Sequence, residues 1–295
     1  MDPPRSALRS RAAVNAAHTT GSGLSGHLRL KCALDSRGRS ALVSQSFSAP
    51  FHLSKPHWDA NTLVLNVVNP TPGFFAGDHV SSQVEVESGA SLLITTPSAS
   101  RVHRSRGAAA TVLQHFGVQE GAHLEYLPEI FIPQAGARYR QYSRVDLDPG
   151  STLLFWEMIA PGRVASGEVF QFEELDWETE IAIQGILAAR ERYRLTRDGA
   201  AVRALQAQFR DAYYLSLYVF SPALTPQSPC WSALNELHGA DAWIGTSALA
   251  HGGFVVKVVA AGSILLRRKA SDIRTVLYAA LGRPAPDLRR ITPLQ

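Results

Sequence analysis

Cysteine and methionine are scarce in this sequence, with 2 of each among 295 residues. Cys32 and Cys230 lie far apart, and neither belongs to a Cys-x-x-Cys pair. This excludes a disulfide framework and a structural zinc site of the usual kind, and it fits a reducing compartment. We therefore expect a cytoplasmic protein whose core needs no covalent staples.

Long hydrophobic runs are missing as well. The longest, residues 252–266, is interrupted by Lys257, Gly262 and Ser263, whereas a membrane helix needs about 20 apolar residues. We expect no membrane association. The composition, 45% hydrophobic and 18% charged, is typical of a globular protein.

Charge is distributed unevenly around a net value of +4. Residues 1–40 and 257–295 are basic, whereas residues 119–191 hold five Arg against thirteen Asp and Glu. Basic ends can favour nucleic acid, but no aromatic-interleaved basic stripe accompanies them, so we expect no nucleic-acid partner. The Arg-, Ala- and Ser-rich start fits a transit peptide or an unstructured tail. Because it lacks an amphipathic period, we expect a flexible basic tail at residues 1–25 and a single β-rich domain at residues 26–295.

Alternation of polar and apolar residues with a period of two recurs along the chain, separated by turn residues such as Asp-Pro-Gly. It predicts strands at residues 27–34, 80–87, 90–96, 111–118, 123–127, 138–147, 151–156, 169–183 and 186–195. Many short strands indicate a mainly β fold, with packed or β-helix-like sheets. No internal repeat supports a regular solenoid.

Helix signals are few. The best covers residues 271–282, where Ser271 can cap the first turn and Gly282 can end the last. A weaker signal covers residues 200–209. The sequence therefore predicts a few helices, one of them near the C-terminus.

Common catalytic motifs are absent or out of context. Residues 21–26 match G-x-G-x-x-G, but no strand is predicted before them, and a strand instead of a helix is predicted after them, so a dinucleotide site is not supported. There is no Walker lysine loop, no G-x-S-x-G elbow and no H-E-x-x-H. The ten histidines are scattered and show no ligand spacing.

Four segments stand apart from this general pattern: NPTPGFFAGD (69–78), LITTPSASRVHRS (93–105), LEYLPE (124–129) and WEMIAPGRVASGE (156–168). In this order they resemble the UreD family of urease accessory proteins, called UreH in some organisms, over about residues 40–195. There are departures: Arg101 replaces the common lysine, His103 replaces a tyrosine, and Tyr126 replaces a tryptophan. An Arg keeps the charge of a Lys but changes its donor geometry.

The resemblance implies a mainly β, non-catalytic urease maturation factor. Such proteins bind apo-urease and the partner UreF, which recruits the GTPase UreG. It implies no permanently bound cofactor. Nickel, as Ni²⁺ in transit, would pass towards the urease active site.

Carriage of Ni²⁺ requires ligands that exchange, and isolated oxygen ligands hold it more loosely than imidazole or thiolate clusters. We therefore hypothesise that single carboxylates line a water-filled passage. The candidate ligands are Asp78, Glu125, Glu129, Glu157, Glu168 and Glu191. Buried carboxylates need counter-charges or water, and the available arginines are Arg101, Arg104, Arg163 and Arg190.

Simpler interpretations remain open for these residues. Asp78 could bind its own turn, Glu125 could face solvent, and Arg163 could fix a loop. Phe74 and Phe75 could belong to the core or form an exposed anchor for a partner. The residues assigned structural or partner-binding roles are Phe74, Phe75, Thr95, Thr96, Arg101, Arg104 and Arg163.

Two other functions remain alternatives. A β-fold carbohydrate-active hydrolase would use two carboxylates about 5–10 Å apart. A partner-binding scaffold without any metal role is the other.

Overall fold

The computed structural model of the protein describes residues 23–59 and 61–288. Its strands are β1 (Ser25–Leu34), β2 (Ser40–Phe47), β3 (His52–Leu53), β4 (His57–Asp59), β5 (Thr62–Val68), β6 (His79–Val86), β7 (Ser91–Thr95), β8 (Ser100–Val102), β9 (Ala110–Val118), β10 (His123–Leu127), β11 (Phe131–Pro133), β12 (Arg138–Leu147), β13 (Thr152–Ile159), β14 (Glu174–Ile183), β15 (Ile186–Thr196), β16 (Tyr213–Phe220), β17 (Ala242–Ala248) and β18 (Phe254–Ala260). Its helices are the 3-10 helix η1 (Val164–Ser166) and the α-helices α2 (Ala200–Gln208), α3 (Cys230–Glu236) and α4 (Ser263–Ala280).

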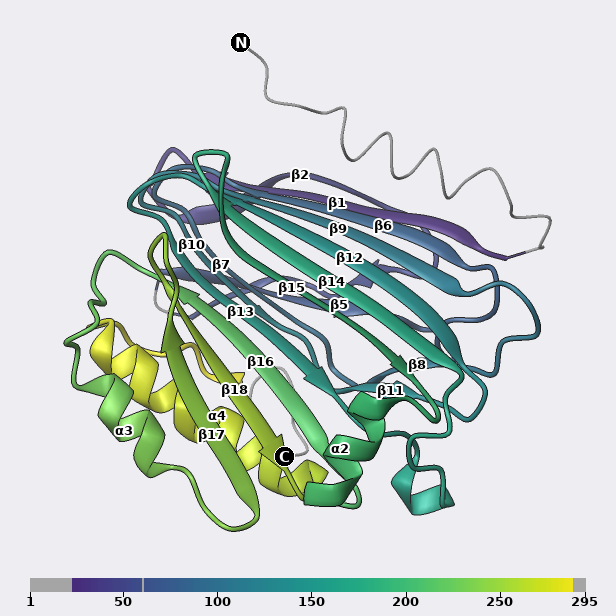
Figure 1. Cartoon of the computed structure of the whole chain (residues 1–295). Helices are drawn as coiled ribbons and strands as arrows, with labels where there is room; N and C mark the ends of the chain where they lie inside the picture. The colour runs from purple at the N-terminus through teal and green to yellow at the C-terminus, as the bar shows by residue number, and fades with distance from the viewer. Residues whose placement is uncertain (1–22, 60, 289–295) are drawn as a thin grey trace.

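The strands form two sheets that face each other (Figure 1). The 7-stranded sheet has the order β15-β14-β12-β9-β6-β1-β2. The 11-stranded sheet follows β17-β18-β16-β13-β10-β7-β5-β3, with β4, β8 and β11 attached beside this path. From β5 to β14 the long strands alternate between the sheets, and successive strands of each sheet pair in parallel. The chain thus winds in stacked coils, which confirms the mainly β fold with β-helix-like sheets.

One end of the stack consists of short turns, at residues 87–90, 119–122 and 148–151. In each, the fourth residue donates its amide hydrogen to the carbonyl of the first. The third residue is a glycine with a positive φ of 73°, 66° or 75°, a conformation that glycine adopts without steric cost. These turns set the repeat of the coils even though the strand sequences do not repeat.

The other end carries the long connections, at residues 69–78, 96–109, 128–137 and 160–173. They include β8, β11 and η1, and β8 pairs with β11 across two of them. All four sequence segments that resemble the UreD family reach this end, on the right in Figure 1. The coil topology therefore brings together segments that are about 30 residues apart in the sequence.

The two faces of each sheet have different environments. Apolar side chains of both sheets fill the space between them, as in the cluster around Phe116, Phe155 and Leu92. The outer face of the 11-stranded sheet is covered by α3 and α4, which bury Trp156 and Leu217 beneath them.

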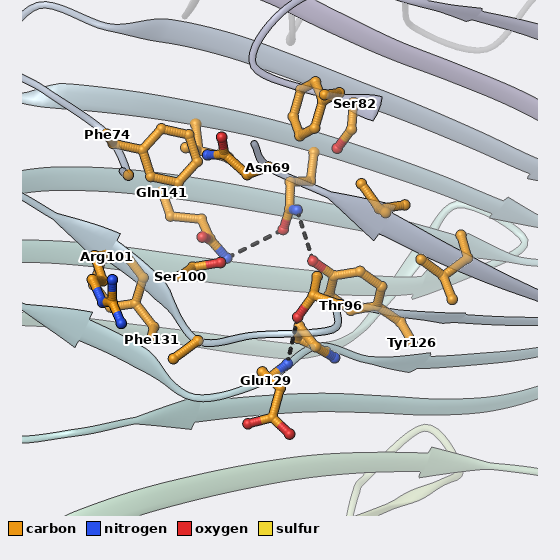
Figure 2. Close-up of a pocket in the computed structure, with 18 of the residues that line it drawn as sticks. Asn69, Phe74, Ser82, Thr96, Ser100, Arg101, Tyr126, Glu129, Phe131 and Gln141 are labelled. Atoms are coloured by element: carbon orange, nitrogen blue, oxygen red, sulfur yellow. Dashed lines mark hydrogen bonds between the residues drawn. The ribbon is translucent and has the colours of Figure 1, made fainter. Parts of the chain in front are cut away.

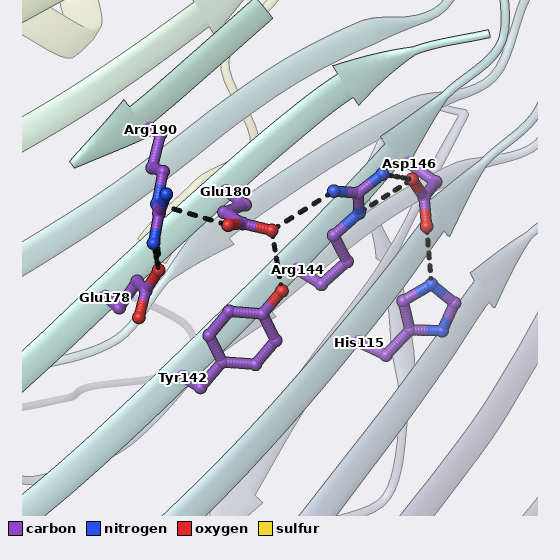
Figure 3. Close-up of polar contacts among 7 residues, drawn as sticks. All are labelled: His115, Tyr142, Arg144, Asp146, Glu178, Glu180 and Arg190. Atoms are coloured by element: carbon purple, nitrogen blue, oxygen red, sulfur yellow. Dashed lines mark hydrogen bonds and ion pairs between the residues drawn. The ribbon is translucent and has the colours of Figure 1, made fainter. Parts of the chain in front are cut away.

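The outer face of the 7-stranded sheet is charged (Figure 3). Arg190 on β15 lies against Glu178 and Glu180 of β14, with its shortest contact to Glu178 at 2.7 Å. Arg144 on β12 continues the row to Glu180 and Asp146. Because each arginine in this row contacts an acid, the face is close to neutral.

The helix predicted at 271–282 is real, but its predicted start is wrong. α4 begins at Ser263, directly after β18, and Gly262 occupies the position before its first turn. Ser271 is therefore inside the helix and caps nothing. No described helix is both long and apolar enough to span a membrane.

The predicted tail, residues 1–25, lies outside the described residues except for its last three. Gly23 lies against the Gly77–Asp78 peptide, where a Cβ on Gly23 would meet the Gly77 carbonyl oxygen at 2.0 Å. The amide of Leu24 donates to the Asp78 carboxylate at 2.9 Å. The described part of the chain thus joins the domain from its first residue.

Candidate functional site

A cavity of about 160 Å³ runs between the two sheets from the end with the long connections (Figure 2). Near the surface it is lined by Asn69, Ser98 and Arg101, of which Ser98 and Arg101 are exposed. At depth it reaches Glu157 and Trp177, which are both buried. The cavity therefore connects the end that carries the four motif segments with the interior of the sandwich.

Hydrogen-bonded polar side chains form part of the cavity wall. Gln141 donates to Gln114 at 3.2 Å, and Gln114 donates to the Tyr126 hydroxyl at 3.1 Å (Figure 2). Tyr139 donates in turn to Gln141 at 2.7 Å. These groups lie between the apolar clusters of the sandwich, so a polar layer crosses its interior.

Glu157 is the acid at the inner end of this layer, and its side chain is almost fully buried. Its Oε1 accepts hydrogen bonds from Trp177 Nε1 at 2.7 Å and from Thr179 Oγ1 at 2.6 Å. Its Oε2 has no partner among the described residues. Burial raises the pKa of Glu157 to about 7, against the two hydrogen bonds, which lower it. The group can therefore exchange a proton near neutral pH.

Strand register places a second acid beside this layer. Glu157 on β13 lies opposite Ser216 on β16, and Ser216 lies opposite Lys257 on β18. In the other sheet, Thr179 lies opposite Glu191 on β15. The Lys257 ammonium contacts the Glu191 carboxylate and lies 3.0 Å from Ser216 Oγ. A row of polar side chains thus spans both sheets at one level.

Glu191 is fixed by its neighbours. It accepts hydrogen bonds from Tyr214, Ser216 and Tyr218 in addition to its ion pair with Lys257. Burial would raise its pKa, but the Lys257 charge and these hydrogen bonds prevail and lower it. Its charge also raises the pKa of Glu157, so the two acids interact electrostatically.

Asp78 and Glu125 have other partners and do not line the cavity. Asp78 accepts hydrogen bonds from the amides of Leu24, at 2.9 Å, and Phe75, at 2.8 Å, which is the simpler interpretation of this residue. Glu125 lies on the opposite face of its sheet, under α4, where Arg274 binds both of its oxygens at 2.8 Å. It does not face solvent.

Glu168 and Glu129 belong to the long connections. Glu168 binds Arg163 Nε at 2.8 Å and the amide of Ala135 at 3.0 Å, so Arg163 fixes this loop through a carboxylate. Glu129 borders the cavity, and its carboxylate pairs with Arg267 of α4 at 2.9 Å.

The remaining predicted residues divide between core and surface. Phe74 packs in the core near Tyr139, whereas Phe75 is 43% exposed and stacks on His103 at 4.5 Å. Thr95 is buried in β7, and Thr96 lines the cavity and accepts a hydrogen bond from the Glu129 amide. Arg101 and Arg104 are both exposed, Arg101 at the cavity entrance.

The structure therefore brings Glu157 and Glu191 into one polar layer and separates the other candidate acids from it. The sequence patterns did not single out the residues that complete the layer, namely Gln114, Gln141, Trp177, Thr179, Ser216 and Lys257. The sequence signal that could have identified them is a polar side chain at a strand position that alternation assigns to the interior. Residues 23–59 and 61–288 contain no group of three or more His, Cys, Asp or Glu side chains placed to hold a metal ion.

Comparison with known proteins identifies the family. A family model described as UreD urease accessory protein matches residues 24–292. The chain is 42% identical to the urease accessory protein UreD of Opitutus terrae over 270 residues, covering 90% of this chain and 98% of that protein. It is 26% identical to that of Acetivibrio thermocellus over 245 residues, covering 82% of this chain and 94% of that protein. This chain belongs to the UreD family of urease accessory proteins.

Proposed function

We propose that this chain is a non-catalytic urease maturation factor that carries Ni²⁺ in transit through the interior of its β sandwich. The ion would enter or leave at the long connections and pass Glu157. The observation that carries this proposal is the buried Glu157 carboxylate, which lines the cavity with one oxygen unpartnered among the described residues. A buried polar atom without a partner is costly, so such an atom calls for an ion, a proton or water.

The surroundings of Glu157 suit transit better than storage. A single carboxylate with amide and hydroxyl neighbours offers oxygen ligands, which hold Ni²⁺ weakly compared with imidazole or thiolate clusters. Its pKa of about 7 means that proton and cation compete for the same oxygen near neutral pH. An arriving cation would displace the proton, and its departure would allow the proton to return.

This cavity is too small for the sugar site that the hydrolase alternative needs. Sites for small organic ligands are usually about 300–1,000 Å³, whereas this cavity measures about 160 Å³. It has room for a hydrated ion at most. A scaffold without a metal role remains the alternative that an experiment must exclude.

The proposed partners follow from membership of the family: apo-urease, UreF and, through UreF, the GTPase UreG. The long connections are the surface where a partner would meet the cavity, because its exposed lining lies there. We expect this assembly to act in the cytoplasm, where a reducing environment keeps Cys32 and Cys230 as the free thiols seen in the structure.

Reconstitution tests the proposal. Apo-urease is incubated with Ni²⁺, GTP, UreF, UreG and either the wild-type chain or Glu157→Gln, and the nickel content of urease is measured. Glutamine keeps the shape and the acceptor for Trp177 and Thr179 but removes the charge. We expect Glu157→Gln to lower nickel content while the protein complex still forms.

The matched control is Glu236→Gln, the same chemical change at an exposed position of α3. It should leave nickel content unchanged. Equal nickel loading by Glu157→Gln and wild type, with intact complexes, would favour the scaffold alternative. Loss of the complex itself would point to a structural role for Glu157.

A further inference from the structure

One of the long connections, residues 96–109, is basic. Arg101, Arg104 and Arg106 follow each other on one connection and are all exposed. No acid lies between residues 96 and 109. This surface contrasts with the charged row of the 7-stranded sheet, where each arginine contacts an acid.

One arginine of this connection, Arg104, lines an open hollow together with two arginines of neighbouring segments, Arg138 and Arg197. The hollow measures about 510 Å³ and is bordered by Arg104, Arg138 and Arg197, together with Ser105 and Glu173. It lies where β9, β12 and β14 begin and where β15 ends. Parallel pairing of β9 with β12 brings Arg104 and Arg138 to the same end of the sheet, and the antiparallel pairing of β15 with β14 returns Arg197 to it.

The guanidinium groups in the hollow are only weakly neutralised. Arg138 lies 3.6 Å from Glu173 and 3.9 Å from Glu174, and Glu174 is already paired with Arg194 at 2.7 Å. Arg197 donates to the backbone carbonyl of Gln171 at 2.9 Å. Arg104 forms no ion pair within 4.0 Å among residues 23–59 and 61–288, its charge lowers the pKa of Glu168, and its side chain lies against Gly136. Donors for oxyanions are therefore available in excess of acceptors.

The basic hollow and the cavity entrance share one connection, because Arg104 of the hollow is three residues after Arg101 of the entrance. Three residues span at most about 11 Å of chain. The exposed arginine charges beside the entrance repel a divalent cation, unless salt screens them or another surface covers them. A cation that reaches Glu157 through this entrance would therefore do so when an anionic surface covers the arginines.

We propose that the Arg104–Arg138–Arg197 hollow docks a protein partner through a carboxylate-rich acidic surface. Guanidinium groups bind carboxylates in bidentate geometry, so an exposed Asp or Glu pair fits this hollow. Docking there neutralises the rim and places the partner over the cavity entrance. The inference rests on the proposed function, because the docked partner is the one that exchanges the ion with the cavity.

Binding measurements test the docking site. The full chain is titrated separately with apo-urease and with UreF, between about 50 and about 300 mM NaCl. The variant is Arg104→Gln/Arg197→Gln, and the matched control is Arg37→Gln/Arg268→Gln, which removes two exposed charges elsewhere. We expect the variant to bind one of the two proteins about tenfold more weakly at low salt, with a smaller salt dependence, and the control to bind like wild type.

Three outcomes would overturn the inference. If variant and control bind both proteins equally, the hollow is not the docking site, and the proposed function stands. In the second outcome, inorganic phosphate is added at constant ionic strength. If partner binding is lost only because phosphate occupies the hollow, the hollow is a small-anion site. If the wild-type chain binds neither protein, both the docking site and the proposed function fail.

Discussion

Arg274 of α4 binds both carboxylate oxygens of Glu125 on β10 at 2.8 Å, in the layer between the 11-stranded sheet and the helix. Glu125 is fully buried, and Tyr278 also donates to it, at 2.7 Å. Burial by itself would lower the pKa of Arg274. The hydrogen bond and the charge of Glu125 outweigh burial and raise that pKa. The pair joins residues that are 149 positions apart in the chain.

Removing one member of this pair should be costly. Arg274→Met leaves an uncompensated carboxylate in a buried layer, so we expect the free energy of unfolding to fall by about 3–5 kcal/mol. The double variant Glu125→Leu/Arg274→Met removes both charges and should recover most of that loss. Urea denaturation measures all three proteins, with exposed Arg268→Met as the control on the same helix. A double variant as unstable as Arg274→Met would contradict this account.

The pKa of Glu157 predicts a pH dependence of stability. Burial raises it from 4.5 in the unfolded chain to about 7 in the folded protein. The folded state therefore binds more protons than the unfolded state between these values, so this group's contribution falls as pH rises through that window. Glu157→Gln cannot lose a proton, and its stability relative to wild type should rise by up to about 3 kcal/mol across the window.

Urea denaturation at a series of pH values measures this difference. Glu236→Gln, on the exposed surface, serves as the control and should follow the wild-type curve. If the difference in the free energy of unfolding between Glu157→Gln and wild type does not change with pH, Glu157 is ionised throughout this window. In that case, proton and cation would not compete at this site.

The fold could be predicted from local patterns because polar and apolar residues alternate along many of its strands, as they do in β9 and β12. β9, β10 and β12 lie within one residue of their predicted bounds, since alternation and turn residues both mark them. The β-helix-like sheets were predicted, but the period of the coils was not, because that period is contained in turns that share only a third-position glycine, as at Gly89, Gly121 and Gly150. The strands between these turns differ in sequence, so the repeat of the coils is not visible as a sequence repeat.

The site was harder to predict because its residues meet through long-range packing. Alternation places Glu125 and Glu157 correctly on strands, but it does not reveal what covers each face. Glu125 faces α4, which lies far along the sequence, and Glu157 faces the cavity between the sheets. Likewise, Lys257 meets Glu191 only because β18 and β15 belong to opposing sheets.

Two glycines of one long connection provide a matched stability test. Gly162 has φ +147°, and a Cβ there would lie 2.3 Å from the carbonyl oxygen of Glu168. Gly167 has φ +73° but has open space around it. We expect Gly162→Ala to cost about 2–4 kcal/mol and Gly167→Ala about 1 kcal/mol in thermal or urea unfolding. Equal costs would contradict this account, because both the φ of Gly162 and the close approach of the Glu168 carbonyl predict the larger cost there.

Lys257 should set the protonation of both acids in the polar layer. Its charge lowers the pKa of Glu191 and opposes the rise in the pKa of Glu157. In Lys257→Met that charge is absent, so both carboxyl groups should hold their protons to higher pH. If Ni²⁺ competes with these protons, nickel transfer to apo-urease by the variant should be slower at about pH 7 and should recover towards about pH 8.

The measurement is the rate of nickel transfer as a function of pH in the reconstituted system, for wild type, Lys257→Met and Lys269→Met. Lys269 lies on α4 and donates to the Leu237 carbonyl, so its loss removes the same charge away from the layer. A purely structural role for Lys257 would lower the rate equally at every pH. A shift of the profile to higher pH, seen in Lys257→Met and not in Lys269→Met, is the result that ties the ammonium group to proton and cation exchange at Glu157 and Glu191.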